Sequence, residues 1–202
     1  MARTALVTIL LSSTAILTYV GYRALDLVTI PLETTEEVAA TIKYVETLPE
    51  FSLENINGEQ QSILSWPDKA LLVNFWATWC APCLREIPLL SEYQTNNENL
   101  SFQVVGIAVD QADSVKAFIN NMGVNYPILI GQSDAMDAAA SFGVEFFGLP
   151  FSVFTDTEGQ ILGVHTGELR AGDLDELMSV LKDLASGTID LDDARGRLAY
   201  RI

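Results

Sequence analysis

The sequence has few cysteines, histidines and basic residues, and each shortage excludes a class of function. Its 202 residues include two cysteines and one histidine, His165. This is too few for a structural zinc site with four nitrogen or sulfur ligands, and for a framework of several disulfides. Lysine and arginine number 11 against 27 acidic residues, which gives a net charge of −16. Because such a surface repels phosphate backbones, we expect no nucleic-acid partner.

An uncharged run from Ala5 to Tyr22 lies near the N-terminus, between Arg3 and Arg23. As a helix it would reach about 28 Å at ~1.5 Å per residue, just enough for the core of a bilayer. We therefore predict that residues 1–25 form a transmembrane anchor. A cleaved signal peptide is one alternative, because residues 13–15 have the small side chains of a cleavage site. A soluble helix is another.

Residues 26–48 are predicted to form a helical stem between the anchor and a compact domain. Thr34 and Glu37 have the spacing of a capping box, which predicts a helix from Thr35 to Glu46. The domain is expected over residues 49–187. Residues 188–202 remain as a tail, acidic first and basic last, for which a helix is one expectation and the sequence indicates no function.

Strands and helices alternate through the domain. Asn57-Gly58 predicts a β-hairpin, and the apolar run Leu71–Ala77 predicts a strand buried on both faces. This order predicts an α/β fold with a sheet between layers of helices and an N-terminal β-hairpin extension. The other predicted elements are helices over Ala81–Asn96, Asp110–Met122, Ser133–Phe142 and Asp173–Ala185, with Asp173 as the N-cap of the last, and strands over Phe102–Val109, Tyr126–Ile130, Phe151–Thr155 and Gln160–Thr166.

The two cysteines stand three residues apart, where the predicted strand ends and the helix begins. Unpaired backbone N–H groups and the positive end of the helix favour a thiolate at Cys80. Cys83 follows within the first turn, so its sulfur can reach back to Cys80. Pro82 is tolerated there because its missing N–H is not needed. The pair therefore predicts a redox-active disulfide, with two inert buried thiols as the alternative.

The segment Asn74–Cys83, NFWATWCAPC, followed by Glu86 and Pro88, resembles the membrane-anchored thiol–disulfide oxidoreductases of the TlpA/ResA/CcmG type in the thioredoxin superfamily. The resemblance covers about residues 49–185 and implies a thioredoxin-like fold. Further matching pieces are residues 123–127, residues 148–150 with Phe154, and residues 156–159.

The resemblance also implies roles for individual residues. Cys80 would be the exposed nucleophile and Cys83 the resolving thiol. Pro150 would be a cis-proline that faces the cysteines, keeps metal from the dithiol and presents the Leu149 backbone to a substrate strand. The residues expected to bind substrate are Trp79, Pro82, Leu149 and Pro150.

Glu86 stands three residues after Cys83, so both side chains face the same side of the helix. The resemblance implies that Glu86 accepts protons from the cysteines or tunes their pKa, and partial burial would raise the pKa of Glu86 itself. A solvated carboxylate is the alternative. Asn74 stands where cytosolic thioredoxins have a buried aspartate. Because an amide cannot relay protons, Glu86 is the candidate for that task.

Two other features have less specific interpretations. His165 lies on a predicted edge strand, and we expect a structural role for it. The segment Val144–Gly148 is more aromatic than the resemblance predicts. Phe146, Phe147 and Phe151 are expected to form either an apolar substrate groove or part of the core.

For function, the resemblance implies a periplasm-facing enzyme on a bacterial cytoplasmic membrane. Its substrates would be periplasmic apoproteins with cysteine pairs, such as apocytochrome c or a copper-centre subunit, and a membrane thiol transporter of the DsbD or CcdA kind would supply electrons. The absence of histidine between the cysteines favours a reductant. No metal is expected, and no cofactor besides the Cys80–Cys83 disulfide.

Two alternatives to a reductant remain. One is a thiol oxidase or isomerase that uses the same site, and the other is a membrane-tethered metallochaperone without enzymatic activity. A peroxiredoxin is disfavoured because Ala77 stands where that family has a threonine.

Overall fold

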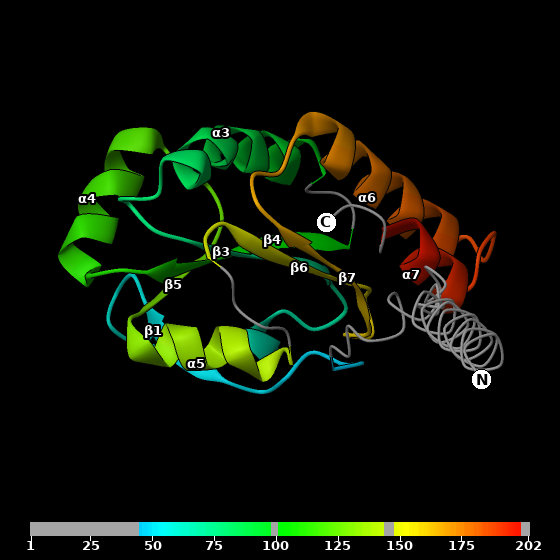
Figure 1. The fold of residues 1–202 in the computed structure, drawn as a ribbon, viewed down its shortest axis with the longest axis horizontal. Helices are drawn as coiled ribbons and strands as arrows, with labels where there is room; N and C mark the ends of the chain where they lie inside the picture. The colour runs from blue at the N-terminus through cyan, green and yellow to red at the C-terminus, as the bar shows by residue number, and fades with distance from the viewer. Residues whose placement is uncertain (1–44, 98–100, 144–147, 199–202) are drawn as a thin grey trace, which may run out of the picture. The chain divides into compact units, whose positions relative to one another are not determined.

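The computed structural model describes residues 45–97, 101–143 and 148–198 (Figure 1). The predicted anchor, residues 1–25, and the stem up to residue 44 lie outside them. The prediction of a stem helix as far as Glu46 is wrong at its end, because Val45 and Glu46 are not helical and Thr47 forms a β-bridge with Gln160. Within the described ranges, no helix combines the length and the hydropathy needed to cross a bilayer.

The described residues form a seven-stranded sheet in the order β2-β1-β5-β4-β3-β6-β7. β4 pairs in parallel with both β3 and β5, whereas the outer pairs are antiparallel. The elements are β1 (Ser52–Asn55), β2 (Gln60–Ser62), a 3-10 turn (Ile63–Ser65), β3 (Ala70–Trp76), α3 (Ala81–Asn96), β4 (Phe102–Val109), α4 (Ala112–Met122), β5 (Ile128–Gly131), α5 (Ser133–Ser141), β6 (Phe151–Thr155), β7 (Ile161–Thr166), α6 (Ala171–Ala185) and α7 (Leu191–Leu198).

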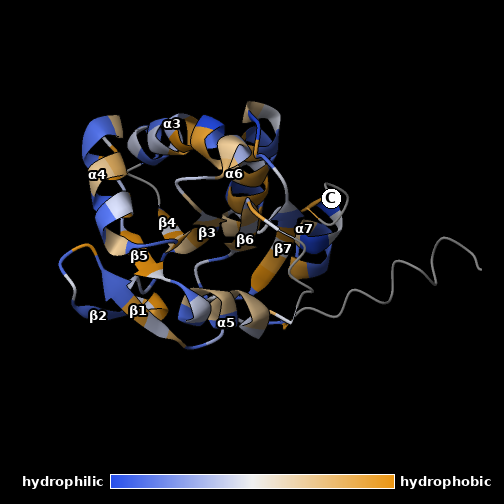
Figure 2. Ribbon diagram, turned by 60° about the vertical axis from the view of Figure 1, so that its left-hand side comes forward, coloured by the Kyte–Doolittle hydropathy of each residue, from blue (hydrophilic) through white to orange (hydrophobic). Residues whose placement is uncertain are grey.

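Helices cover both faces of the sheet, which confirms the predicted layers. Figure 1 shows α3, α4 and α6 on one side of the sheet and α5 on the other. Alternate residues of β3 enter two cores: Leu72 and Trp76 pack with α3, α4 and α6, whereas Val73 and Phe75 pack with α5. Every residue of β3 is buried, as expected of a central strand with both faces covered. Hydrophobic residues are accordingly concentrated in the central strands (Figure 2).

The predicted β-hairpin at Asn57-Gly58 is present between β1 and β2, with Gly58 at a φ of 81° that favours glycine. β1 adds this hairpin to the sheet through its antiparallel pairing with β5. At the other edge of the sheet, β7 contains His165, as predicted.

The beginning of α6 differs from the prediction. Arg170, not Asp173, is its N-cap, and the Asp173 carboxylate accepts a hydrogen bond from the Arg170 backbone N–H over 2.9 Å. Asp173 therefore caps the helix from its third position, because the carboxylate that reaches a free N–H lies one turn inside the helix. Part of the tail forms α7, whose Leu198 packs over Gly163 of β7.

Candidate functional site

The two cysteines form a disulfide at the beginning of α3. Cys80 is the N-cap of the helix, with extended backbone angles, and its Sγ accepts a hydrogen bond from the Cys83 N–H over 3.3 Å. The two Cα atoms are 5.3 Å apart, a distance typical of disulfides. Pro82 occupies the first turn, where no N–H is required. The local turn from β3 into α3 therefore brings the two cysteines of the predicted redox pair together.

Access to the two sulfurs is unequal. Cys80 is 5% exposed and Cys83 is fully buried, so Cys80 is the more accessible of the two, although less exposed than predicted. Trp79, immediately before it, is 69% exposed. Pro82 is half-buried in the first turn. The accessible surface at the disulfide is therefore largely apolar.

Two hydrogen bonds to Asp110 fix the segment before Cys80. The backbone N–H of Thr78 donates to Asp110 Oδ2 over 3.0 Å, and the Thr78 hydroxyl donates to the same oxygen. Asp110 directly follows β4, which pairs in parallel with β3. Because parallel strands end at the same edge of the sheet, the Asp110 carboxylate lies where the chain leaves β3 for Cys80.

The Leu149–Pro150 peptide bond is cis, as predicted. Pro150 precedes β6, and Phe151 pairs with Phe75 near the end of β3. Pro150 therefore lies at the same edge of the sheet as Cys80, with Leu149 half-buried beside it. Of the three aromatic residues predicted near this segment, Phe151 belongs to the core, where it is 2% exposed and packs against Phe75. Phe146 and Phe147 lie outside the described residues.

Glu86 is a buried carboxylate, 1% exposed, so the alternative of a solvated side chain is wrong. Oε1 accepts from Asn74 Nδ2 over 2.8 Å and Oε2 accepts from the Leu169 N–H over 2.6 Å. Desolvation raises the pKa of Glu86 from 4.5 to about 7, against the lowering effect of both hydrogen bonds. A carboxyl that titrates near neutrality, one helical turn after Cys83, can exchange protons with thiols.

Three polar side chains, those of Asn74, Ser152 and Tyr126, lie around Glu86 in the interior. Asn74 also donates to Ser152 Oγ over 3.0 Å, while Asn74 Oδ1 has no hydrogen-bond partner among the described residues. The Tyr126 hydroxyl is likewise buried without such a partner, and desolvation together with the Glu86 charge raises the pKa of Tyr126. Glu86 and Asn74 thus form the centre of a buried polar cluster.

Sequence reasoning missed several of these contacts. Asp110, Tyr126, Ser152 and Leu169 lie between 32 and 83 residues from the side chain or segment that each contacts. Leu169 contributes only its backbone N–H, which almost any residue carries, so its side chain gives no signal. A polar residue inside the apolar strand β6 was the available signal for Ser152.

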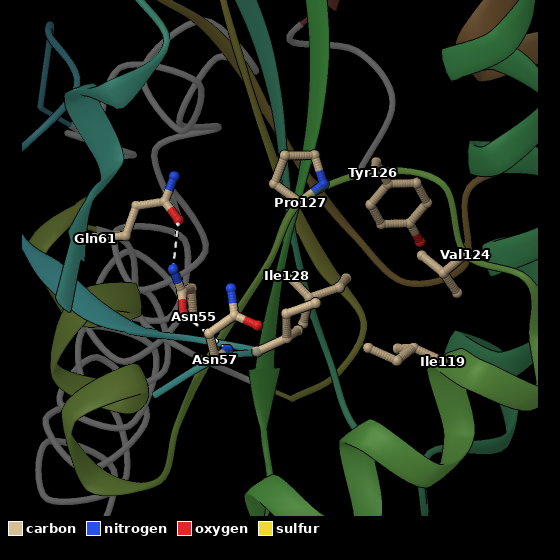
Figure 3. A pocket seen from close by; sticks show the side chains of 9 residues that line it. Asn55, Asn57, Gln61, Ile119, Val124, Tyr126, Pro127 and Ile128 are labelled. Carbon is tan, nitrogen blue, oxygen red and sulfur yellow. Dashed lines mark hydrogen bonds between the residues drawn. The ribbon is translucent and has the colours of Figure 1, made fainter. Parts of the chain in front are cut away.

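A small pocket of about 250 Å³ lies away from the cysteines, between the β1–β2 hairpin and the segment from α4 to β5 (Figure 3). Tyr126 lines it, together with Pro127 and Ile128, and the hairpin side contributes Asn55 and Gln61. A larger groove of about 1070 Å³ lies between the β6–β7 turn and the C-terminal part of α6. Neither cysteine lines either hollow.

The family and the relatives agree with this chemistry. The family model described as AhpC/TSA matches residues 45–164. Thiol-disulfide oxidoreductase ResA of Geobacillus kaustophilus is 27% identical over 73% of this chain and 82% of its own. Thioredoxin-like protein YneN of Bacillus subtilis is 28% identical over 80% of this chain and 91% of its own.

A solved structure extends the comparison. The thiol:disulfide interchange protein of Chlorobium tepidum, described as a thioredoxin family protein, is 32% identical, with a TM-score of 0.60 over 69% of this chain and 97% of that one. With cysteines paired at the N-terminus of α3 and a thioredoxin-like fold beneath them, the chain is a thiol–disulfide oxidoreductase and belongs to the AhpC/TSA family.

Proposed function

We propose that the chain is a dithiol reductant of protein disulfides, with Cys80 as the nucleophile and Cys83 as the resolving thiol. The observation that carries these roles is the unequal access of the two sulfurs, since only Cys80 reaches the surface. The reducing direction is supported by the Ala-Pro pair between the cysteines, which contains no histidine.

In this cycle the reduced enzyme donates two electrons. The Cys80 thiolate attacks one sulfur of the substrate disulfide, forms a mixed disulfide and releases the other substrate sulfur as a thiolate, which takes a proton. Glu86 accepts the proton of Cys83. The Cys83 thiolate then attacks the Cys80 sulfur of the mixed disulfide and releases the second substrate sulfur as a thiolate, which takes a proton. The enzyme is left with the Cys80–Cys83 disulfide.

The substrates that we propose are periplasmic apoproteins with a cysteine pair, either apocytochrome c or a copper-centre subunit. Exposed Trp79, half-buried Pro82 and the Leu149–Pro150 segment would bind them. A membrane thiol transporter of the DsbD or CcdA kind would return two electrons to the disulfide. The uncharged run Ala5–Tyr22 supports an anchor in the bacterial cytoplasmic membrane. Protease digestion of spheroplasts tests the periplasmic side.

The reduction potential of the full-length protein tests the direction. Equilibration against dithiothreitol or glutathione buffers, followed by thiol alkylation, gives the fraction of reduced Cys80–Cys83. A potential near or below about −270 mV, that of thioredoxin, supports a reductant. A potential near about −120 mV, that of DsbA, would show a disulfide-introducing enzyme instead. Stable stoichiometric Cu(I) binding by the reduced protein would indicate a metallochaperone.

A further inference from the structure

The loop between β7 and α6, residues 167–170, is bound at each of its residues. The Gly167 N–H donates to the Pro150 carbonyl over 2.9 Å, and the Glu168 carboxylate pairs with Arg85. The Leu169 N–H donates to Glu86 Oε2 over 2.6 Å. The Arg170 N–H is bound by Asp173 at the start of α6. The loop therefore connects the peptide of Pro150 directly to the carboxylate of Glu86.

Two of these contacts, Arg85–Glu168 and Glu86–Leu169, join consecutive residues of α3 to consecutive residues of the loop. Arg85 precedes Glu86 in α3, and Glu168 precedes Leu169 in the loop, so the ion pair and the Leu169–Glu86 bond join the same two segments side by side. Arg85 Nε lies 3.1 Å and 2.9 Å from the two Glu168 oxygens, and Nη2 forms a further bond to one of them. A bidentate geometry of this kind fixes orientation as well as distance.

We propose that the Arg85–Glu168 ion pair is a positioning pair, which holds the Leu169 N–H against the Glu86 carboxylate and so sets how readily Glu86 takes up a proton during thiol–disulfide exchange. The pair lies at the surface, with side-chain exposures of 60% and 27%, whereas the bond that it supports is buried. A surface contact thereby controls a buried proton acceptor.

The groups around Glu86 shift its pKa in opposite directions, so the direction of the change in a variant tests the proposal. β3 contributes the Asn74 amide, which also binds Ser152 of β6, and the segment before β5 contributes Tyr126. From the loop, the Leu169 N–H lowers the pKa of Glu86, while the Glu168 charge raises it by a smaller amount. Removing the Glu168 charge therefore lowers the pKa of Glu86 if that charge acts only through space, but raises it if the Leu169 bond is lost.

The experiment is a pH titration of the Glu86 carboxyl carbon by NMR in the oxidised full-length protein, native and Glu168→Gln. We expect the pKa of Glu86 to rise by about half a unit in the variant, a size consistent with the modest strength of exposed ion pairs. Amide hydrogen exchange at Leu169 should accelerate in parallel. An unchanged or lowered pKa of Glu86 would overturn the proposal.

Glu176→Gln is the matched control. It removes an ion pair of the same chemistry between α6 and Arg197 of α7, outside the set of groups around Glu86. We expect no change at Glu86 or Leu169, and an equal effect of both variants would attribute the shift to general loosening and reject the positioning role.

The inference rests on the proposed role of Glu86 as proton acceptor. Both readouts use the protein without substrate, so an oxidising potential would reject the reductant assignment and leave them unaffected. The pH profile of substrate reduction connects the two. If Glu86 accepts the proton in turnover, the midpoint of the profile moves with the pKa of Glu86 in Glu168→Gln, and a midpoint that does not move would separate Glu86 from the reaction.

Discussion

Asn74 Nδ2 donates a hydrogen bond of 2.8 Å to Glu86 Oε1 inside the protein, and 12 residues separate the two in the chain. Asn74 stands in β3 where the superfamily resemblance leads one to expect an aspartate, and Glu86 stands on α3 above it. The pair therefore combines one neutral donor with one carboxyl. Of the two side chains, only the Glu86 carboxyl can bind and release a proton, and it lies on the helix that carries the cysteines.

Asn74→Asp would place a second carboxyl against the first. Because the repulsion between two buried carboxylates makes it unfavourable to ionise both, we expect the two carboxyls to share a proton. The upper apparent pKa of the pair should then lie above 7. Relative to the native protein, the free energy of unfolding should then fall as the pH rises through neutrality, by about 3 kcal/mol or more. Urea unfolding at pH 5 and pH 8 measures this loss.

Ser152→Ala is the control for that variant, because it removes one hydrogen bond of Asn74 and adds no charge. Its cost should be about 1 kcal/mol and the same at both pH values. A loss in Asn74→Asp that did not depend on pH would show that the two carboxyl groups do not interact.

The native protein should itself lose stability between about pH 4.5 and pH 7 through Glu86. Its pKa is raised from 4.5 to about 7 in the folded state, so in this range the unfolded chain releases a proton that the folded protein retains. Unfolding is then favoured as the pH rises, by about 3 kcal/mol over the whole range, and the effect is constant above pH 7.

The variant Glu86→Gln tests this pH dependence, because its unfolding free energy can be subtracted from that of the native protein at each pH. The variant changes the hydrogen bonds to Asn74 and Leu169, which alters its stability by a constant amount, but it has no group to titrate. The difference between native and variant unfolding free energies should therefore slope across pH 4.5–7 and be flat elsewhere. A flat difference throughout would mean that Glu86 titrates at its ordinary value.

Cys83→Ser should trap a mixed disulfide with a protein substrate, because Cys80 can still attack and no resolving thiol remains. Cys80→Ser should trap none, since Cys83 is fully buried. Non-reducing electrophoresis after incubation with an oxidised substrate protein distinguishes the two variants. A mixed disulfide formed by Cys80→Ser would reverse the assigned roles.

Trp79→Ala should leave the free energy of unfolding within about 0.5 kcal/mol, because 69% of the side chain is already exposed. The kcat/KM for a protein disulfide should fall about tenfold, as for an exposed aromatic residue at a binding surface, and that for a small aromatic disulfide should change little. Leu64→Ala, at a side chain 49% exposed in the turn after β2, is the control. Equal losses with both substrates would show that Trp79 acts on the disulfide itself.

Local patterns predicted most of the elements, because each depends on neighbours in the chain. α3 and β4 have the predicted bounds, and the cysteines meet at the start of α3 because their spacing and Pro82 specify that turn. The N-cap of α6 was misplaced at Asp173. Its carboxylate is the capping group, but it acts from the third helical position. The N-cap itself is Arg170, whose side chain has no hydrogen-bond acceptor and so gives no capping signal in the sequence.

The sequence by itself determined the reaction that this protein performs, since two cysteines in one turn and their apolar surroundings are local features. Only the tertiary structure decided where the Glu86 carboxyl is placed and which groups set its pKa. Burial raises the pKa of Glu86, and its partners Asn74 and Leu169 reach it across 12 and 83 residues of chain. One of them is a backbone N–H, which becomes specific only through its position in the fold.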